Sequence, residues 1–107
     1  MLFSLKQEAP ASIGGGTFTV RYSTKFKRDV KLAKKRGLPL KELKDIIETL
    51  ATGKKLDPKY HDHNLSGNYA MFRECHIQPD WLLIYRMNDK ELEVLAYRTG
   101  THCDLFE

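Results

Sequence analysis

Histidines are the residues of this chain best suited to acid–base chemistry, and the sequence contains four of them, at positions 61, 63, 76 and 102. Histidine gives and takes protons near neutral pH because its unperturbed pKa is about 6.5. Two arginines, Arg73 and Arg98, carry planar guanidinium groups that match the geometry of a phosphate. RNA is cut when its own 2′-hydroxyl attacks the adjacent phosphorus, which requires a base, an acid and a cation. These residue types could supply all three without a metal or another cofactor.

The order of the expected strands brings several of these side chains to one place. Antiparallel neighbours reverse direction at each turn. His76 lies at the end of one expected strand, and Asp80 and Trp81 lie at the start of the next. The following strand runs back, so Arg98 and His102 return to the same end. We therefore expect these five side chains to gather at one edge of a sheet, where Trp81, Tyr69 and Phe106 could stack on exposed bases.

Hydrophobic periodicity predicts the elements that position this edge. Alternation over Thr17–Tyr22 predicts a strand, and helical spacing predicts one helix from a cap at Ser23 or Thr24 to Arg36. A second helix is expected from about Pro39 to Thr52. The remaining expected elements are a loop over residues 54–68, strands at Tyr69–Ile77, Trp81–Met87 and Glu91–Arg98, and a short tail.

This order of elements, β-α-α-β-β-β, predicts an α+β domain. Short connections favour one antiparallel sheet of about four strands, with the two N-terminal helices packed on one face and the other face left for solvent or a ligand. Residues 1–16 are rich in turn-forming residues and are expected to be a flexible N-terminal extension. Residues 17–107 are then expected to form the folded domain.

The charge balance suits a polyanionic partner or an acidic protein, although a solvated basic surface would explain it equally well. Lys and Arg number 18 against 14 Asp and Glu, which gives a formal net charge of +4. Lys27, Lys31 and Lys34 lie on the polar face of the first expected helix and could contact RNA phosphates. The sequence shows neither a membrane-spanning stretch nor a secretory signal, so a cytoplasmic protein without a membrane partner is expected.

Other chemistries have weaker support in the sequence. His61 and His63 with His76 or His102 could bind zinc, but the spacing matches no strong zinc pattern. A nucleophilic Cys75 assisted by His76 is disfavoured, because adjacent strand residues point to opposite faces. The two cysteines are expected to be free thiols, with a Cys75–Cys103 disulfide left open.

Asp80, Trp81 and the arginines also have ordinary structural explanations. Asp80 follows Pro79 and is typical of a turn, and a lone tryptophan in a strand is commonly part of a core. Arg73 and Arg98 could be solvated or paired with carboxylates. The expected convergence of the side chains at one edge is what favours a functional site.

Several separated segments resemble the motifs of one known family. His61–Gly67 is similar to a K-D-H-x-L-x-G segment, with His61 where that pattern has lysine. Arg73–Tyr85 is similar to R-x-x-H-x-x-P-D-W-[IL]-L-I-Y, and Arg98–His102 to R-T-G-[ST]-H. Tyr22–Leu32 and the final Leu105-Phe106 also fit. These motifs belong to the YafQ toxins of the RelE/ParE superfamily, and the resemblance covers nearly everything from Thr17 onward; the sixteen preceding residues have no counterpart.

The resemblance implies a RelE-like fold and an endoribonuclease toxin of a type II toxin–antitoxin pair. Such toxins cut mRNA on the translating ribosome at the A site, and a cognate antitoxin protein blocks them. The family's motifs imply functional roles, without a metal or cofactor, for the matching residues here, which are His63, His76, Asp80, Trp81, His102 and Phe106. The free toxin is expected to be a monomer.

Two other functions remain open at this stage. A toxin of the related ParE branch would act by binding DNA gyrase and would need no catalytic histidines. A catalytically silent RNA-binding module could share the same fold. The presence of His76, Asp80 and His102 favours the mRNA endonuclease over both.

Overall fold

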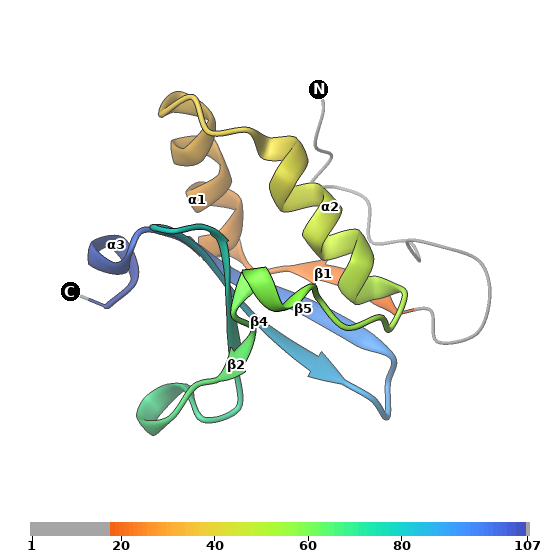
Figure 1. Cartoon of the computed structure of the whole chain (residues 1–107). Coiled ribbons are helices and arrows are strands. Elements are labelled where there is room, and N and C mark those ends of the chain that lie inside the picture. Colours follow the sequence, from red (N-terminus) through yellow and green to blue (C-terminus); the bar gives the residue numbers. More distant parts are fainter. Residues whose placement is uncertain (1–17, 107) are drawn as a thin grey trace.

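A mixed five-stranded sheet forms the centre of the computed structural model, which describes residues 18–106 (Figure 1). The strand order is β1-β5-β4-β3-β2. β1 pairs with β5 in parallel, and the other neighbours are antiparallel. The strands are β1 (Thr19–Tyr22), β2 (His63–Asn64), β3 (Arg73–Gln78), β4 (Trp81–Asn88) and β5 (Glu93–Gly100).

The α+β class, the two N-terminal helices and the β3-β4-β5 meander agree with the prediction, while the form of the sheet differs from it. The sheet has five strands rather than about four, and it is not wholly antiparallel. The direction of β1 depends on the long connection through both helices, which a local pattern does not determine. β2 has only two residues within the expected loop, too few for any alternation to be visible.

Two amphipathic helices cover one face of the sheet (Figure 1). α1 (Thr24–Lys35) begins at Ser23, whose hydroxyl accepts a hydrogen bond from the Phe26 amide at 2.9 Å. α1 ends before Gly37, which takes a φ of 78°. α2 (Leu40–Ala51) follows, and Pro39 precedes it as the N-cap rather than being its first helical residue.

β4 is buried on both faces. Trp81, Leu83 and Tyr85 point into the main core beneath α1 and α2. Leu82 and Ile84 point the other way, into a smaller apolar cluster. The second face is therefore only partly left to solvent, because Leu65, Phe72, Tyr97 and Leu105 pack over its centre.

Three short helices occupy segments expected to be loop, strand or tail. They are η1 (Pro58–Tyr60), η2 (Gly67–Tyr69) and α3 (His102–Phe106). The strand expected from Tyr69 begins only at Arg73.

α3 is stabilised at its N-terminus by two hydrogen bonds between Thr101 and Asp104. Hydrophobic periodicity could not predict this helix, because five residues are too few to show a helical repeat. The Asp104 amide donates to the Thr101 hydroxyl at 3.1 Å, and the Thr101 amide donates to the Asp104 carboxylate at 2.9 Å. Gly100 has to be glycine, because a Cβ there would lie 2.9 Å from the Asp104 Cβ.

No helix within residues 18–106 is long and apolar enough to span a membrane. The extension expected over residues 1–16 lies outside the residues that the structure describes.

Candidate active site

A cluster of histidines lies on the sheet face opposite α1 and α2. His76 comes from β3, His63 from the short edge strand β2, and His102 from the first position of α3. The His76 ring centroid lies 5.9 Å from that of His102, 6.3 Å from that of His63 and 5.6 Å from that of His61. The structure thus brings three of the predicted site histidines together, with His61 as a fourth.

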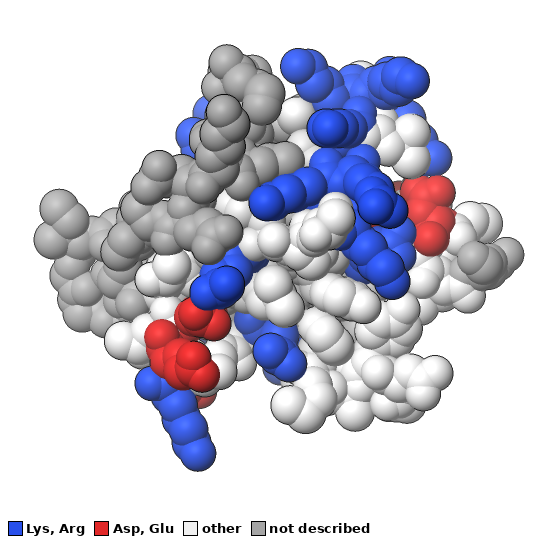
Figure 2. All heavy atoms as spheres, turned by 180° about the vertical axis from the view of Figure 1, so that it is seen from behind, with Lys and Arg blue, Asp and Glu red and all other residues white. Residues whose placement is uncertain are grey.

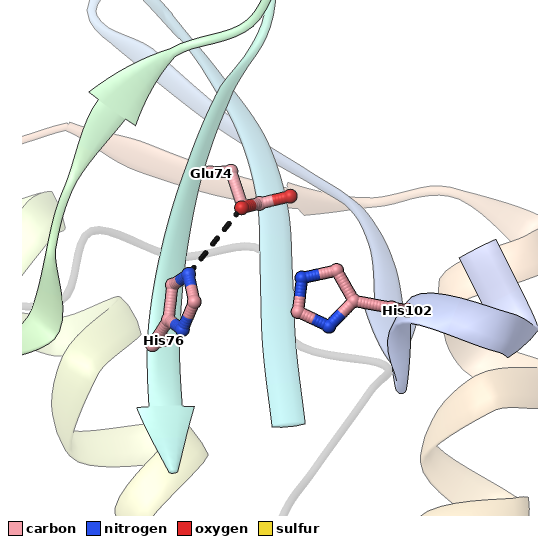
Figure 3. Close-up of side chains that lie close together, drawn as sticks. All are labelled: Glu74, His76 and His102. Atoms are coloured by element: carbon pink, nitrogen blue, oxygen red, sulfur yellow. Dashed lines mark ion pairs between the residues drawn. The ribbon is translucent and has the colours of Figure 1, made fainter. Parts of the chain in front are cut away.

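Glu74 lies at the centre of this cluster and was missed by the sequence analysis. Its side chain is buried, and its Oε1 lies 3.5 Å from His76 Nε2 and 3.4 Å from His63 Nε2. Figure 3 shows Glu74 reaching towards His76 beside His102. The signal was present, because Glu74 and His76 are two residues apart in a strand and so share a face. The Glu74 carboxylate therefore links the rings contributed by β2 and β3.

Asp80 orients His102. Its Oδ1 lies 3.0 Å from His102 Nδ1 and also accepts the His102 backbone amide at 3.2 Å. The hydrogen bond from the imidazole, followed by that from the amide, lowers the pKa of Asp80 below its ordinary value. An ionised Asp80 favours a proton on Nδ1, which directs the other ring nitrogen to a substrate.

A half-buried polar network fixes the loop that carries His61 and His63. Asp62 accepts hydrogen bonds from the Tyr85 hydroxyl at 2.5 Å and from Arg73 Nη2 at 3.1 Å. Arg73 also donates to Asn64 at 2.6 Å. We call Asp62, Arg73 and Tyr85 the loop latch. Burial, followed by the bond to Asp62, raises the pKa of Tyr85, so its hydroxyl stays a donor.

The two arginines expected to bind phosphate are held by carboxylates. Arg73 belongs to the loop latch. Arg98 donates from Nε and Nη2 to Asp29 of α1 at 2.7 and 3.1 Å, which takes its guanidinium to the helix rather than to the histidines. The expectation that Arg98 joins the cluster is therefore wrong. Alternation alone could not show that an acid on α1 would lie opposite it.

Trp81 is a core residue. Its side chain is 2 % exposed and packs beneath α1 and α2, on the side of the sheet away from the histidines. The expectation that it stacks on an exposed base is wrong for this structure. Its indole Nε1 is buried without a hydrogen-bond partner among the described residues. Trp81 can act on the site by fixing the start of β4, next to Asp80.

Phe106 is placed where stacking on a base is possible. It is 42 % exposed, and its ring centroid lies 6.4 Å from that of His102. It also meets Tyr69 edge-on at 5.7 Å. Phe106 and Tyr69 therefore form an aromatic border beside the cluster, suited to an unstacked base.

Basic side chains gather over α1, as Figure 2 shows from behind. Lys31 and Lys34 are exposed, and Lys27 is half-buried. Arg36, at the end of α1, donates to Asp104 of α3 at 2.7 Å, which brings the basic helix next to the element that bears His102. This basic surface suits contacts with phosphates of a nucleic acid.

A metal ion could be held by Glu74, His76 and His102, since one ligand atom from each lies within 4.8 Å of the others (Figure 3). This set differs from the His61/His63 combination considered from sequence.

The two cysteines are not placed for nucleophilic catalysis at this cluster. Burial raises the pKa of the Cys75 thiol, and Cys75 and the exposed Cys103 are both free thiols.

Comparison with known proteins identifies the family. The sequence model described as "Bacterial toxin of type II toxin-antitoxin system, YafQ" matches residues 18–107. The curated mRNA interferase toxin YafQ of Escherichia coli K12 is 41% identical over 88 residues, covering 81% of this chain and 94% of the relative.

Solved structures of similar toxins share the fold. The crystal structure of the E. coli DinJ–YafQ toxin–antitoxin complex matches with a TM-score of 0.78 and 37% identity, covering 85% of this chain and 99% of the matched chain. A metal-bound toxin from Helicobacter pylori matches with a TM-score of 0.80 and 42% identity, over 84% of this chain and 100% of its own. The histidine-bearing α+β domain is thus that of a small bacterial toxin. This chain belongs to the YafQ family of type II toxin–antitoxin systems.

Proposed function

We propose that this protein is a ribosome-dependent mRNA endonuclease that inhibits translation as the toxin of a type II pair. The observation that carries the proposal is the cluster of His63, His76 and His102 around Glu74, with Asp80 orienting His102. The E. coli relative is named an mRNA interferase, which supports the same activity here.

The cluster suits attack by the 2′-hydroxyl of RNA. One imidazole accepts the hydroxyl proton as the oxygen bonds to phosphorus, and another donates a proton to the departing 5′-oxygen. The rings of His76 and His102 lie edge to face with their centroids 5.9 Å apart, so a phosphate bound beside the pair would be within reach of both imidazoles. One side chain gains a proton and another loses one, so the reaction requires neither a metal nor a cofactor.

The two arginines do not supply positive charge to a phosphate at the cluster. Arg73 and Arg98 are engaged by Asp62 and Asp29 and are not directed at the cluster. The Glu74 carboxylate lies beside Nε2 of both His63 and His76, so it holds the two rings in place. We therefore assign Arg73 and Arg98 to positioning the site rather than to binding phosphate.

A cognate antitoxin is the second partner that we propose. The DinJ–YafQ complex shows that a related toxin is bound by such a protein. The basic charge and exposed histidines of this chain suit an acidic segment that orders on binding. The proposed setting is the cytoplasm, where ribosomes and the antitoxin are both present.

Two alternatives share the fold. A gyrase-binding toxin or a silent RNA-binding module would have no use for a buried glutamate shared by two histidines, whereas the endonuclease would.

The test is to incubate the purified protein with ribosomes translating a defined mRNA and to map new RNA ends. The proposal expects cuts at codons in the A site and far fewer on the same mRNA without ribosomes. Intact mRNA under both conditions, with inhibited gyrase in a parallel assay, would instead support the ParE-like alternative.

A further inference from the structure

A cavity of about 1020 Å³ adjoins the histidine cluster on one side. Its wall includes His63 and His76, and it continues between η1, the end of β3 and the first turn of α2. His102, Asp80 and Phe106 are not part of its lining, so the cavity and the aromatic border flank the cluster separately. A ribonucleotide could enter it while its phosphate stays near His76.

The wall formed by η1 is aromatic and basic. Tyr60 is half-buried and packs against the main core, which fixes its ring. The Lys59 ammonium lies 5.1 Å from the centroid of that ring. A fixed ring beside a cation suits a stacked base with its phosphate nearby, the pattern by which proteins bind single-stranded RNA.

Another part of the wall carries a hydrogen-bonded pair from two elements. Gln78, at the end of β3, donates from Nε2 to Glu42 Oε1 of α2 at 3.3 Å. Both side chains line the cavity. The Glu42 carboxylate repels phosphate, so this part of the wall favours contact with the edge of a base over contact with the sugar–phosphate backbone of RNA. The lining of the cavity thus includes both an aromatic ring for stacking and a polar pair that can hydrogen-bond a base.

We propose that this cavity is a subsite for the nucleobase next to the cleaved phosphate, and that Glu42 and Gln78 select a base with an exocyclic amino group. The proposal rests on the mRNA endonuclease function and names part of its specificity. Glu42 can only accept hydrogen bonds when ionised, so it pairs with the amino group of cytosine or adenine. Uracil presents a carbonyl oxygen in the position of the cytosine amino group, which Glu42 would repel.

A binding experiment tests the subsite without cleavage. Cytidine 5′-monophosphate and uridine 5′-monophosphate are the probes, because they differ only at C4 and N3, on the base edge that Glu42 and Gln78 would read. In NMR titrations of the full chain, the cytidine nucleotide should shift the amide signals of Lys59–His61 and Gln78, with roughly tenfold tighter binding than the uridine nucleotide. Equal affinities, or shifts confined to other regions, would overturn the proposal.

Variants connect the subsite to cleavage. Glu42→Ala and Gln78→Ala should each reduce the cytidine-over-uridine preference, and should shift the mapped mRNA cuts towards sites with uracil by roughly tenfold relative to cytosine. Glu48→Ala is the matched control, because Glu48 is an exposed glutamate of the same helix that lies outside the cavity lining. Its cut pattern should match that of the wild type.

The outcomes separate the two proposals. Cytidine-selective binding at this cavity without any mRNA cutting would contradict the endonuclease function and leave the cavity as a nucleotide-binding site with the proposed base selectivity. Ribosome-dependent cutting with an unchanged base pattern in both Glu42→Ala and Gln78→Ala would contradict the subsite and leave the endonuclease function standing.

Discussion

His102 is the residue on which the proposed chemistry depends most directly. Its Nδ1 is held by Asp80 at 3.0 Å, and its side chain is about half exposed. Replacing His102 by Ala should lower ribosome-dependent cleavage by ~10²–10⁴-fold, the range for loss of a general acid or base. Folding should be little changed, because the imidazole is not part of either apolar cluster.

Cys103→Ala is the matched control for this variant, since Cys103 is the next residue of α3 and is also exposed. Cleavage rates on translating ribosomes and denaturation midpoints should be measured for both. A well-folded His102→Ala protein that cuts as fast as Cys103→Ala would remove His102 from the mechanism.

Individual site residues were predictable from sequence to different degrees. His76, Asp80 and His102 could be placed together because hairpin geometry and the P-D turn fix which strand ends meet. His63 and Phe106 came from the family resemblance alone. Glu74 was missed although it shares a face with His76, because a glutamate in a strand is usually assigned to solvent.

The elements that present the site are held by polar contacts rather than by apolar packing alone. In the loop latch, Tyr85 is 1 % exposed and its hydroxyl bonds Asp62. Tyr85→Phe should destabilise the protein by about 1 kcal/mol, because the partly buried carboxylate of Asp62 loses a hydrogen-bond donor. Hydrogen exchange at residues 61–64 should speed up and cleavage should fall.

Tyr97→Phe serves as the comparison, since it removes a hydroxyl from the neighbouring strand outside the latch. The role assigned to the latch fails if exchange at residues 61–64 and the cleavage rate are the same in Tyr85→Phe and Tyr97→Phe.

The ion pair between Arg36, at the end of α1, and Asp104 of α3 should make the free energy of unfolding depend on pH in the acid range. The hydrogen bond from Arg36, followed by that from the Thr101 amide, lowers the pKa of Asp104 to about 2. A carboxylate whose pKa is lower in the folded than in the unfolded protein stabilises the fold. The stabilisation is complete above the unfolded pKa of about 3.9, and it is lost as the pH falls from there towards 2.

Asp104→Asn should therefore be less stable than the wild type near pH 7 by about 0.5–1 kcal/mol, because the ion pair is partly exposed. The difference should shrink below about pH 4. Urea midpoints measured across this range, with the exposed turn residue Asp89→Asn as control, provide the test. A difference that stays constant from pH 6 to pH 2 would rule out the ionic contribution.

Long elements were the easiest to predict and short ones the hardest. The two helices and the β3-β4-β5 meander follow from periodicity and turn residues. α3, η1, η2 and β2 are too short to show a period, and they are held by side-chain caps and tertiary bonds instead. The parallel pairing of β1 with β5 depends on the whole chain between them.

At the scale of the molecule, the residues proposed to cleave RNA and the residues proposed to attract it lie on different surfaces. The histidine cluster lies on the sheet face opposite the helices, and the lysines of α1 form a separate basic surface (Figure 2). Replacing Lys27, Lys31 and Lys34 together by Gln should weaken ribosome binding and lower the slope of log affinity against log salt by roughly 2–3. Codon preference should not change, because phosphate contacts carry no base information.

An equal loss of charge elsewhere controls for net charge. The control variant replaces Lys41, Lys44 and Lys90 by Gln. If both triple variants bind ribosomes with the same affinity and salt slope as each other, α1 has no special role and its lysines are a solvated face.

The chemical nature of the new RNA ends is the most direct test of the central claim, that histidines cut RNA by attack of its own 2′-hydroxyl. That attack joins the 2′-oxygen to phosphorus as the 5′-oxygen leaves, so the products carry a 2′,3′-cyclic phosphate and a 5′-hydroxyl. We expect these ends from the wild-type protein on translating ribosomes, with and without a mild chelator. Products with a 5′-phosphate and a 3′-hydroxyl, formed only when a divalent metal is supplied, would contradict the account and assign Glu74, His76 and His102 to metal-assisted hydrolysis instead.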